Sequence, residues 1–248
     1  MLRLIYTIWC CFWLVLLFLV LWPATFIFLQ RISWYPYAHQ VNRIWGKLFF
    51  FLVGIKVEID YRFRPAPSQT YIFCANHFSY LDIAVMGVIL NHYFAFVGKH
   101  EVKNIPLFGY MFRKLHIQVN RVSNQSRASS LHKALKTLAQ GRSIVIFPEG
   151  GIRSKKPPQM HSFMDGAFKM AIQQQVPIVP ITLLTNYLIV ADQSPLRISR
   201  HTLKVVVHKP LTATDWTAEE ATKLKEACFQ VIQTTLDTYH QKKNSDTG

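Results

Sequence analysis

Short β-prone runs alternate with helix-like stretches from residue 56 to the end of the chain, and this alternation limits the possible folds more than any other feature of the sequence. The runs are rich in β-branched and aromatic residues, as buried strands are. We place seven strands, at residues 56–61, 70–75, 93–97, 116–120, 143–147, 178–184 and 203–208. We place helices between and after them, at residues 81–90, 105–114, 127–140, 166–175 and 218–241. Strands that alternate with helices form a mostly parallel sheet flanked by helices, so the predicted fold class is α/β.

The first 55 residues follow a different pattern. Residues 4–30 contain no charged side chain, and a helix of about 20 apolar residues already spans a hydrocarbon core of about 30 Å. Residues 34–55 combine several aromatic side chains with Arg43 and Lys47, as in an amphipathic helix at a membrane interface. We therefore predict a two-helix membrane element at residues 1–55, an α/β domain at 56–241 and a polar, frayed tail at 242–248.

The charge distribution predicts an orientation and a class of partner. Arg3 alone precedes the uncharged run, whereas Arg31, Arg43 and Lys47 follow it, so the positive-inside rule places the α/β domain on the cytoplasmic face of the membrane. Lys and Arg outnumber Asp and Glu by 28 to 13, and the net charge of +15 favours anionic partners. The sequence has no RNA-binding motif, helix-turn-helix signature or zinc finger, so we expect membrane lipids and no nucleic acid.

The first candidate site follows the second predicted strand. In a parallel α/β sheet, ligands bind beyond the carboxyl ends of the strands, and the segment N-H-F-S-Y-L-D at residues 76–82 lies there. Ser79 and Asp82 have the spacing of a capping box, which predicts a helix with Ser79 at its N-cap. His77 then precedes the helix and can fold back onto Asp82, leaving Nε2 free as a general base. The residues alone also fit a surface histidine beside a capping aspartate.

The second candidate site follows the fifth predicted strand. The segment F-P-E-G-G-I-R-S at residues 147–154 carries an acid, Glu149, and then backbone N–H groups beginning at Gly150. Arg153 comes close behind and suits a phosphate group. An ordinary turn of proline and glycine residues is the alternative explanation.

Together the two segments resemble the catalytic blocks of the glycerolipid acyltransferase superfamily, and in particular its 1-acylglycerol-3-phosphate O-acyltransferases. The first resembles the H-x-x-x-x-D block and the second the F-P-E-G-T-R-S block of that family. Three further segments resemble the remaining blocks in the family's order: K-H-E at 99–101, V-N-R at 119–121 and V-P-I-V-P-I at 176–181. The resemblance covers residues 34–184. There is one departure, because Gly151 and Ile152 replace a single threonine and displace Arg153 by one residue.

The resemblance implies a role for each residue. His77 and Asp82 form the catalytic pair, Lys99, Arg121 and Arg153 bind the phosphate of the acceptor lipid, and the carboxylate in block 147–154 contacts the glycerol or a neighbouring cation. Residues 97–160 carry twelve Lys and Arg against two Glu, which is consistent with a phosphate site in this part of the chain.

With these roles, the resemblance implies transfer of an acyl chain from a thioester to the free hydroxyl of 1-acylglycerol-3-phosphate, giving phosphatidate. Such a reaction needs a base, oxyanion donors and a clamp for the headgroup. An acyl carrier protein or coenzyme A thioester is the expected co-substrate. The histidines lack metal-ligand spacing, and no metal or cofactor is expected. Two alternatives stay open: O-acylation of another lyso-lipid, such as a lysophospholipid or a lyso-amino-acid lipid, and a catalytically silent basic protein that binds membranes.

Overall fold

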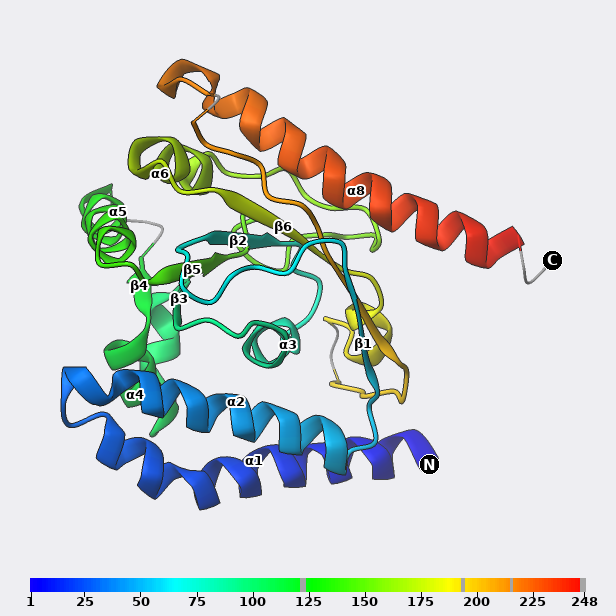
Figure 1. Cartoon of the computed structure of the whole chain (residues 1–248). Coiled ribbons are helices and arrows are strands. Elements are labelled where there is room, and N and C mark those ends of the chain that lie inside the picture. Colours follow the sequence, from blue (N-terminus) through cyan, green and yellow to red (C-terminus); the bar gives the residue numbers. More distant parts are fainter. Residues whose placement is uncertain (121–123, 193–194, 215, 246–248) are drawn as a thin grey trace.

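A computed structural model describes residues 1–120, 124–192, 195–214 and 216–245. Within them the chain forms one seven-stranded sheet with helices on both faces (Figure 1). The α-helices are α1 (Leu2–Phe28), α2 (Tyr35–Leu52), α3 (Asp82–Ile89), α4 (Phe108–Leu115), α5 (Asn124–Ala139), α6 (Gly166–Gln174), α7 (Asn186–Ile189) and α8 (Ala221–Ser245). The strands are β1 (Val57–Tyr61), β2 (Ile72–Ala75), β3 (Phe94–Lys99), β4 (Ile117–Val119), β5 (Ser143–Ile146), β6 (Ile178–Leu183) and β7 (Leu203–Val207). Short 3₁₀ helices lie at Ile32–Trp34, His100–Asn104 and Ala218–Glu220.

The strand order is β1-β7-β6-β2-β5-β3-β4, and five of the six neighbouring pairs are parallel. The exception is β6 with β7, which are antiparallel, so that β1 and β7 run opposite to the other five strands. The predicted fold class, a mostly parallel α/β sheet flanked by helices, is therefore confirmed. Strands β2 and β5 lie next to each other at the centre of the sheet. Their carboxyl ends consequently bring the two candidate segments of the sequence to the same edge.

Each face of the sheet has its own hydrophobic core, and β2 shows how the sequence supplies both. Side chains of a strand alternate between its faces. Phe73 and Ala75 pack into the core shared with α1, α2 and α3, whereas Ile72 and Cys74 pack into the core shared with α5, α6 and α8. All four side chains are buried, which explains why this strand has no polar face.

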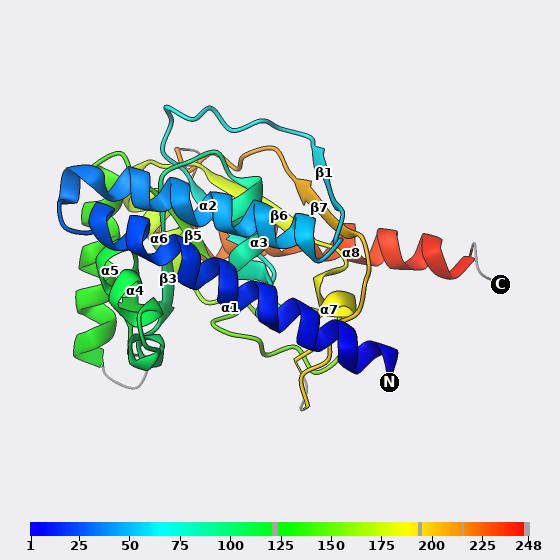
Figure 2. The same ribbon diagram turned by 90° about the horizontal axis from the view of Figure 1, so that it is seen from below.

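Helices α1 and α2 pack against each other and together cover α3 on one side of the molecule (Figures 1 and 2). The contact between α2 and α3 is close at Gly46, where a Cβ atom would lie 2.8 Å from Val88 Cγ2. Pro23 lies inside α1 and removes one hydrogen bond from the helix, because proline has no backbone N–H. The helix nevertheless continues to Phe28.

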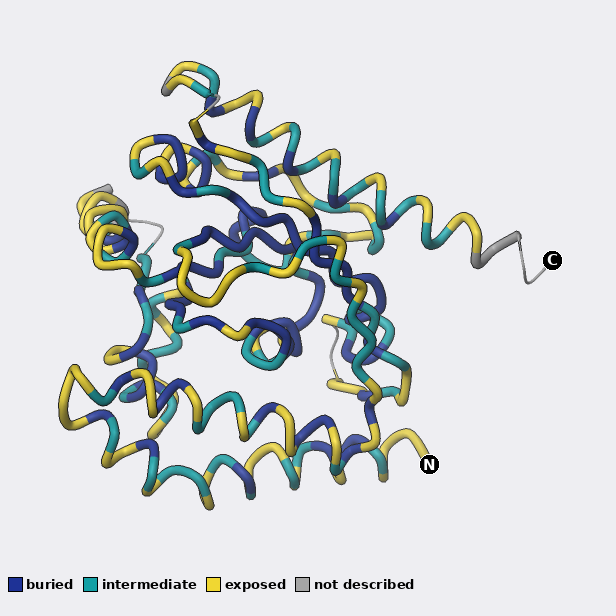
Figure 3. The backbone as a smooth tube through the Cα atoms, viewed as in Figure 1, coloured by how far each residue is buried: buried dark blue, intermediate teal, exposed yellow. Residues whose placement is uncertain are grey.

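Most of α1 is not covered by the rest of the protein (Figure 3). Its buried residues are Thr7, Cys10, Leu17 and Thr25, and the remaining apolar side chains are exposed or half-buried. Among the described residues, α1 is the one helix long and apolar enough to cross a membrane, judged by length and composition. The predicted tail at 242–248 continues α8 as far as Ser245, and its last three residues lie outside the described part of the chain.

Candidate active site

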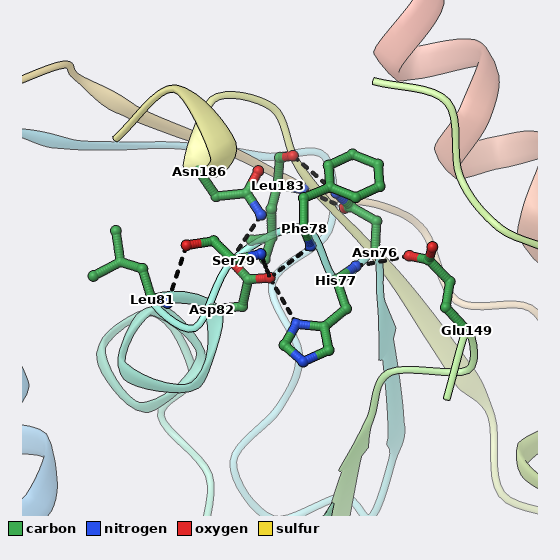
Figure 4. Close-up of polar contacts among 9 residues, drawn as sticks. All are labelled: Asn76, His77, Phe78, Ser79, Leu81, Asp82, Glu149, Leu183 and Asn186. Carbon is green, nitrogen blue, oxygen red and sulfur yellow. Dashed lines mark hydrogen bonds and ion pairs between the residues drawn. The ribbon is translucent and has the colours of Figure 1, made fainter. Parts of the chain in front are cut away.

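The structure brings His77 and Asp82 into direct contact. Asp82 is the first residue of α3, and its Oδ2 atom lies 2.9 Å from His77 Nδ1 (Figure 4). The same oxygen accepts the backbone N–H groups of Phe78 and Ser79, at 3.0 and 3.1 Å. Because a carboxylate only accepts hydrogen bonds, Nδ1 carries the ring proton and Nε2 keeps its lone pair in the neutral imidazole. Asp82 is fully buried, whereas 13% of the His77 side chain is exposed.

The start of α3 differs from the predicted capping box. Leu81, and not Ser79, is at the N-cap, and the hydroxyl of Ser79 accepts the Leu81 N–H at 3.2 Å. The carboxylate half of the box is present, because Asp82 does accept the Ser79 N–H. The helix begins later than predicted because the loop before it is folded around the Asp82 carboxylate. The backbone N–H groups of this loop point at the carboxylate, which they would not do in a helical turn.

Two asparagine side chains attach this loop to the end of β6 and to the start of α7 (Figure 4). Asn76 donates to the carbonyl of Leu183 at 3.0 Å and accepts its N–H at 2.7 Å. The second asparagine, Asn186 of α7, donates from its own segment to Asp82 Oδ1 at 2.7 Å. Both oxygens of the Asp82 carboxylate are therefore occupied, each by partners from a different part of the chain.

The second candidate segment holds His77 from the other side. The Phe147 ring, directly after β5, stacks on the His77 imidazole with ring centroids 4.2 Å apart. Phe96 of β3 lies parallel to Phe147 at a centroid distance of 6.4 Å. Phe96 in turn contacts the His116 ring, which contacts Phe112, so a row of rings extends from His77 to α4.

Glu149 makes contacts within the protein that the resemblance did not imply. Its side chain is fully buried, and its two oxygens accept the backbone N–H groups of His77 at 2.8 Å and His161 at 2.9 Å. A carboxylate used in this way joins the loop of His77 to the segment at His161, and the contact with the glycerol that the resemblance implied stays a prediction. Burial raises the pKa of Glu149 to about 7, although the two N–H donors favour the ionised form.

Gly150 forms the turn that follows. Its φ of +78° is a conformation that side chains rarely adopt, and its N–H donates to the Phe147 carbonyl at 3.0 Å. The N–H that we expected to face a ligand is thus already used within the protein. A Cβ atom here would lie 2.7 Å from the sulfur of Met164, whose exposed and flexible side chain can move, so the positive φ rather than space favours glycine.

Arg153 lines a basic cavity of about 330 Å³. Six neighbours complete its wall: Ser154, Lys155, Lys156, Gln159, Met160 and His161. Lys99, which we expected to bind the same phosphate, is exposed at the end of β3 and does not line this cavity. Arg121, the third predicted phosphate ligand, lies outside the described residues.

An apolar cavity of about 440 Å³ lies between the N-terminal helices and the sheet. Its walls come from α1, α2, α3, α4, β3 and the segment before α4, and Phe96 is one of its lining residues. Phe96 stacks on Phe147, and Phe147 stacks on the imidazole of His77, so two rings connect the wall of this cavity to the proposed site. Gly87 of α3 also lines it and would place a Cβ atom in open space.

Sequence reasoning missed three features of the site. Asn186 gave no signal, because its four-residue helix has no periodicity and the partner, Asp82, is 104 residues away. The Glu149 acceptor bonds depend on the backbone of two distant segments, which residue types do not reveal. Lys155 and Lys156 could have been found, since they continue the basic run that begins at Arg153.

A comparison with protein families matches residues 55–184 to the acyltransferase family model. The chain belongs to the acyltransferase family. The matched region begins before β1 and ends after β6, so it includes both segments that meet at His77. This confirms the resemblance on which the predicted roles were based.

Relatives of this acyltransferase carry a more specific name. A 1-acyl-sn-glycerol-3-phosphate acyltransferase from Chlamydomonas reinhardtii is 31% identical over 202 residues, covering 80% of this chain and 58% of the relative. A chloroplastic enzyme of that name from Arabidopsis thaliana is 26% identical, covering 76% and 55%. The one from Saccharomyces cerevisiae is 25% identical, covering 81% and 66%. The chain thus spans little more than half the length of the plant and algal relatives.

The fold of this acyltransferase is also that of a solved structure. The crystal structure of the 1-acyl-sn-glycerophosphate acyltransferase PlsC from Thermotoga maritima superimposes with a TM-score of 0.78 at 20% identity. The match covers 96% of both chains, so it includes the N-terminal helices as well as the sheet.

Proposed function

We propose that this chain is a membrane-bound O-acyltransferase that moves a fatty acyl chain from an acyl thioester to the free hydroxyl of 1-acylglycerol-3-phosphate, giving phosphatidate. One observation carries the proposal: the His77–Asp82 pair follows β2 and is connected to both cavities. Phe147 and Phe96 link His77 to the apolar cavity, and Glu149, which accepts the N–H groups of His77 and His161, links it to the basic cavity. An acyl chain suits the first cavity and a phosphate headgroup suits the second. The names of the relatives support this choice of acceptor.

In the proposed reaction His77 acts as the general base. Nε2 removes the proton of the acceptor hydroxyl while its oxygen attacks the thioester carbonyl, and Asp82 stabilises the imidazolium that forms. The tetrahedral intermediate then collapses, breaking the carbon–sulfur bond. The proton on Nε2 passes to the departing thiolate, so the enzyme returns to its starting state.

Direct transfer without an acyl-enzyme agrees with the neighbouring nucleophiles. Cys74 and Ser79 are the thiol and hydroxyl nearest to His77 in the sequence, and both are fully buried. The Ser79 hydroxyl is engaged with a backbone N–H. Burial also raises the pKa of the Cys74 thiol well above its usual value, which disfavours the reactive thiolate.

We further propose that α1 and α2 hold the domain at the cytoplasmic face of a membrane. Exposed Ile8 and Phe12 represent the uncovered apolar side of α1, which a lipid phase would solvate. The double variant Ile8→Asp with Phe12→Asp should lose most binding to phospholipid vesicles. Leu131→Asp, which adds one charge at an exposed leucine of α5, is the control and should bind normally.

The decisive test of the activity uses the purified chain in detergent with a panel of acceptors and donors. The acceptors are lysophosphatidate, lysophosphatidylcholine and a lyso-amino-acid lipid, each offered with acyl-coenzyme A and with acyl carrier protein thioesters. We expect lysophosphatidate to be acylated and His77→Ala to lower kcat at least about 10²-fold. His132→Ala, at an exposed histidine of α5, is the control.

Other results would replace the proposal. Selective acylation of the lyso-amino-acid lipid would show that the acceptor carries no phosphate. Equal turnover by the wild type and His77→Ala would exclude this base. Vesicle binding without any acyl transfer would favour a catalytically silent binding protein.

A further inference from the structure

Helix α7 begins with an asparagine that is fully buried and reaches the carboxylate beside the proposed base. Asn186 Nδ2 lies 2.7 Å from Asp82 Oδ1, which is the oxygen that His77 does not contact (Figure 4). Neither Asn186 nor Asp82 is accessible to solvent. The bond therefore joins two side chains in a dry environment, where a charge-assisted hydrogen bond is strong.

The amide of Asn186 can have only one orientation. A carboxylate accepts and does not donate, so the nitrogen and not the oxygen of the amide must face Asp82. Among the described residues, Asn186 Oδ1 is buried and has no hydrogen-bond partner. Leaving an acceptor buried without a partner costs free energy, and the bond to Asp82 is the interaction that compensates for placing an amide here.

The backbone around Asn186 is fixed independently of that bond. The Thr185 hydroxyl donates to the Thr202 carbonyl at 2.8 Å and accepts the Lys204 N–H at 2.9 Å. One residue earlier, the Leu184 N–H donates to the Lys204 carbonyl at 2.9 Å. Asn186 consequently projects from a segment that β7 holds in place.

We propose that Asn186 is a positioning residue for the His77–Asp82 pair. This role rests on the proposed acyl transfer. By occupying Oδ1, the amide prevents the carboxylate from rotating and keeps Oδ2 in line with Nδ1 of His77. It also takes up part of the negative charge of Asp82, which limits how strongly the carboxylate favours the imidazolium form of the base.

The second effect predicts a change with pH. The ionisable groups in contact with His77 among the described residues are Asp82 of α3 and Glu149 after β5, while α7 contributes the neutral amide. Without the amide, the negative charge of Asp82 favours the imidazolium more strongly. The neutral base then forms only at higher pH, so the acidic limb of the pH profile of kcat/KM moves to higher pH.

Two variants distinguish the effect of losing the hydrogen-bond donor of Asn186 from the effect of losing its side-chain volume. Asn186→Ala removes both, whereas Asn186→Leu keeps a similar volume without a donor. We expect both to lower kcat roughly tenfold, since one hydrogen bond to a charged group carries about that factor. Both should move the acidic limb upward by about half a pH unit to one unit, with the KM for lysophosphatidate nearly unchanged.

Thr185→Val is the matched control, because it removes the neighbouring buried hydroxyl and its bonds to β7 without touching Asp82. It should lower the melting temperature but leave the pH profile in place. A purely structural role for Asn186 predicts the same behaviour for all three variants, and that result would overturn the proposal.

A spectroscopic measurement keeps the inference separate from the activity. The proton between His77 Nδ1 and Asp82 is expected as a downfield NMR signal, identified by its loss in His77→Ala. It should shift or broaden in both Asn186 variants and stay in place in Thr185→Val. An unchanged signal in Asn186→Leu would refute the positioning role even if no acceptor is ever acylated, whereas absent acylation with a shifted signal would refute only the proposed function.

Discussion

The imidazole of His77 stacks on the ring of Phe147, with centroids 4.2 Å apart and planes 18° from parallel. Two residues after Phe147, the Glu149 carboxylate accepts the His77 N–H. One short segment after β5 therefore fixes both the ring and the backbone of the proposed base. The hydrogen bond of the His77 ring comes from its own loop, through Asp82, so the base is held between two segments that meet only in the folded sheet.

Phe147→Leu should lower kcat about three- to tenfold with a smaller change in the KM of either substrate. An aromatic pair contributes about 0.5–1.5 kcal/mol beyond its buried area, and here that contribution orients the base. Steady-state kinetics with lysophosphatidate checks this. Phe163→Leu removes a ring stacked on Phe168 at the opposite face of the sheet, and it should lower stability alone. Equal effects of the two variants on kcat would contradict an orienting role for Phe147.

Glu149 should make the protein less stable as the pH rises. Below pH 4.5 the carboxyl is protonated in both states, and between about 4.5 and 7 the unfolded chain releases the proton that the folded chain retains. The free energy of unfolding therefore falls across this window, by up to about 3 kcal/mol at 1.36 kcal/mol per pKa unit.

Glu149→Gln tests this pH dependence. Because glutamine does not ionise, the variant should lose most of the difference in unfolding free energy between pH 5 and pH 8, measured with urea in detergent. It also loses one acceptor for a backbone N–H, so we expect it to be less stable than the wild type at pH 5. Glu226→Gln, on the exposed side of α8, should follow the wild type. A free energy of unfolding that rises from pH 5 to pH 8 in the wild type would contradict the prediction.

Arg153→Ala should raise the KM for lysophosphatidate about tenfold or more and leave the KM for the acyl donor unchanged. A hydrogen bond to a charged group is worth about 1.5–3 kcal/mol, and the headgroup is bound alike in the ground and transition states. Lys169→Ala removes one exposed positive charge from α6 and controls for net charge. If the two variants behave alike, the cavity at Arg153 is not the phosphate site.

Gly87→Leu should shift the preference of the enzyme toward shorter acyl chains. A Cβ atom at this position meets no other atom within 4 Å, and Gly87 lines the apolar cavity, so we expect the leucine side chain to occupy and shorten that cavity. The ratio of kcat/KM values for long and short acyl donors is the measurement. Gly166→Leu is the control, since it too has free space but lies at the start of α6 away from the cavity. An unchanged ratio would show that the acyl chain binds elsewhere.

Gly46→Ala should destabilise the contact between α2 and α3. The added methyl group would lie 2.8 Å from Val88 Cγ2, and overpacking of this kind costs about 1–3 kcal/mol. Val88→Ala in the same chain should recover part of the lost melting temperature, because it makes room for the methyl group. Additive losses in the double variant would mean that the two residues are not coupled.

The sequence predicted the elements well because most of them have strong local signals. All seven strands and the five predicted helices of the domain appear, with ends that differ by a few residues. Strands such as β2 and β6 consist wholly of buried residues, and that composition is visible in the chain. The placement of His77 next to Asp82 also followed from local spacing, because both residues belong to one loop.

The parts that escaped prediction depend on contacts between distant segments. The antiparallel direction of β7 is set by its pairing with both β1 and β6, which no local pattern records. Glu149 has the same residue type whether it binds a ligand or two backbone N–H groups, so only the burial of its surroundings reveals its use. Asn186 is recognisable only once α7 is brought against α3 by the sheet.

The pairing of β1 with β7 has a consequence for how the chain is made. Val57 pairs with Leu203, and the Ile198 N–H donates to the hydroxyl of Thr7 at 3.0 Å. At a synthesis rate of about 5–20 residues per second, Leu203 and Ile198 leave the ribosome on the order of ten seconds after Val57 and Thr7. The N-terminal helices and β1 are thus made before β7, the strand that joins β1 to β6 and to the rest of the sheet. Any truncation from the C-terminus that removes β7 leaves the backbone of β1 without the partner strand that the structure describes for it.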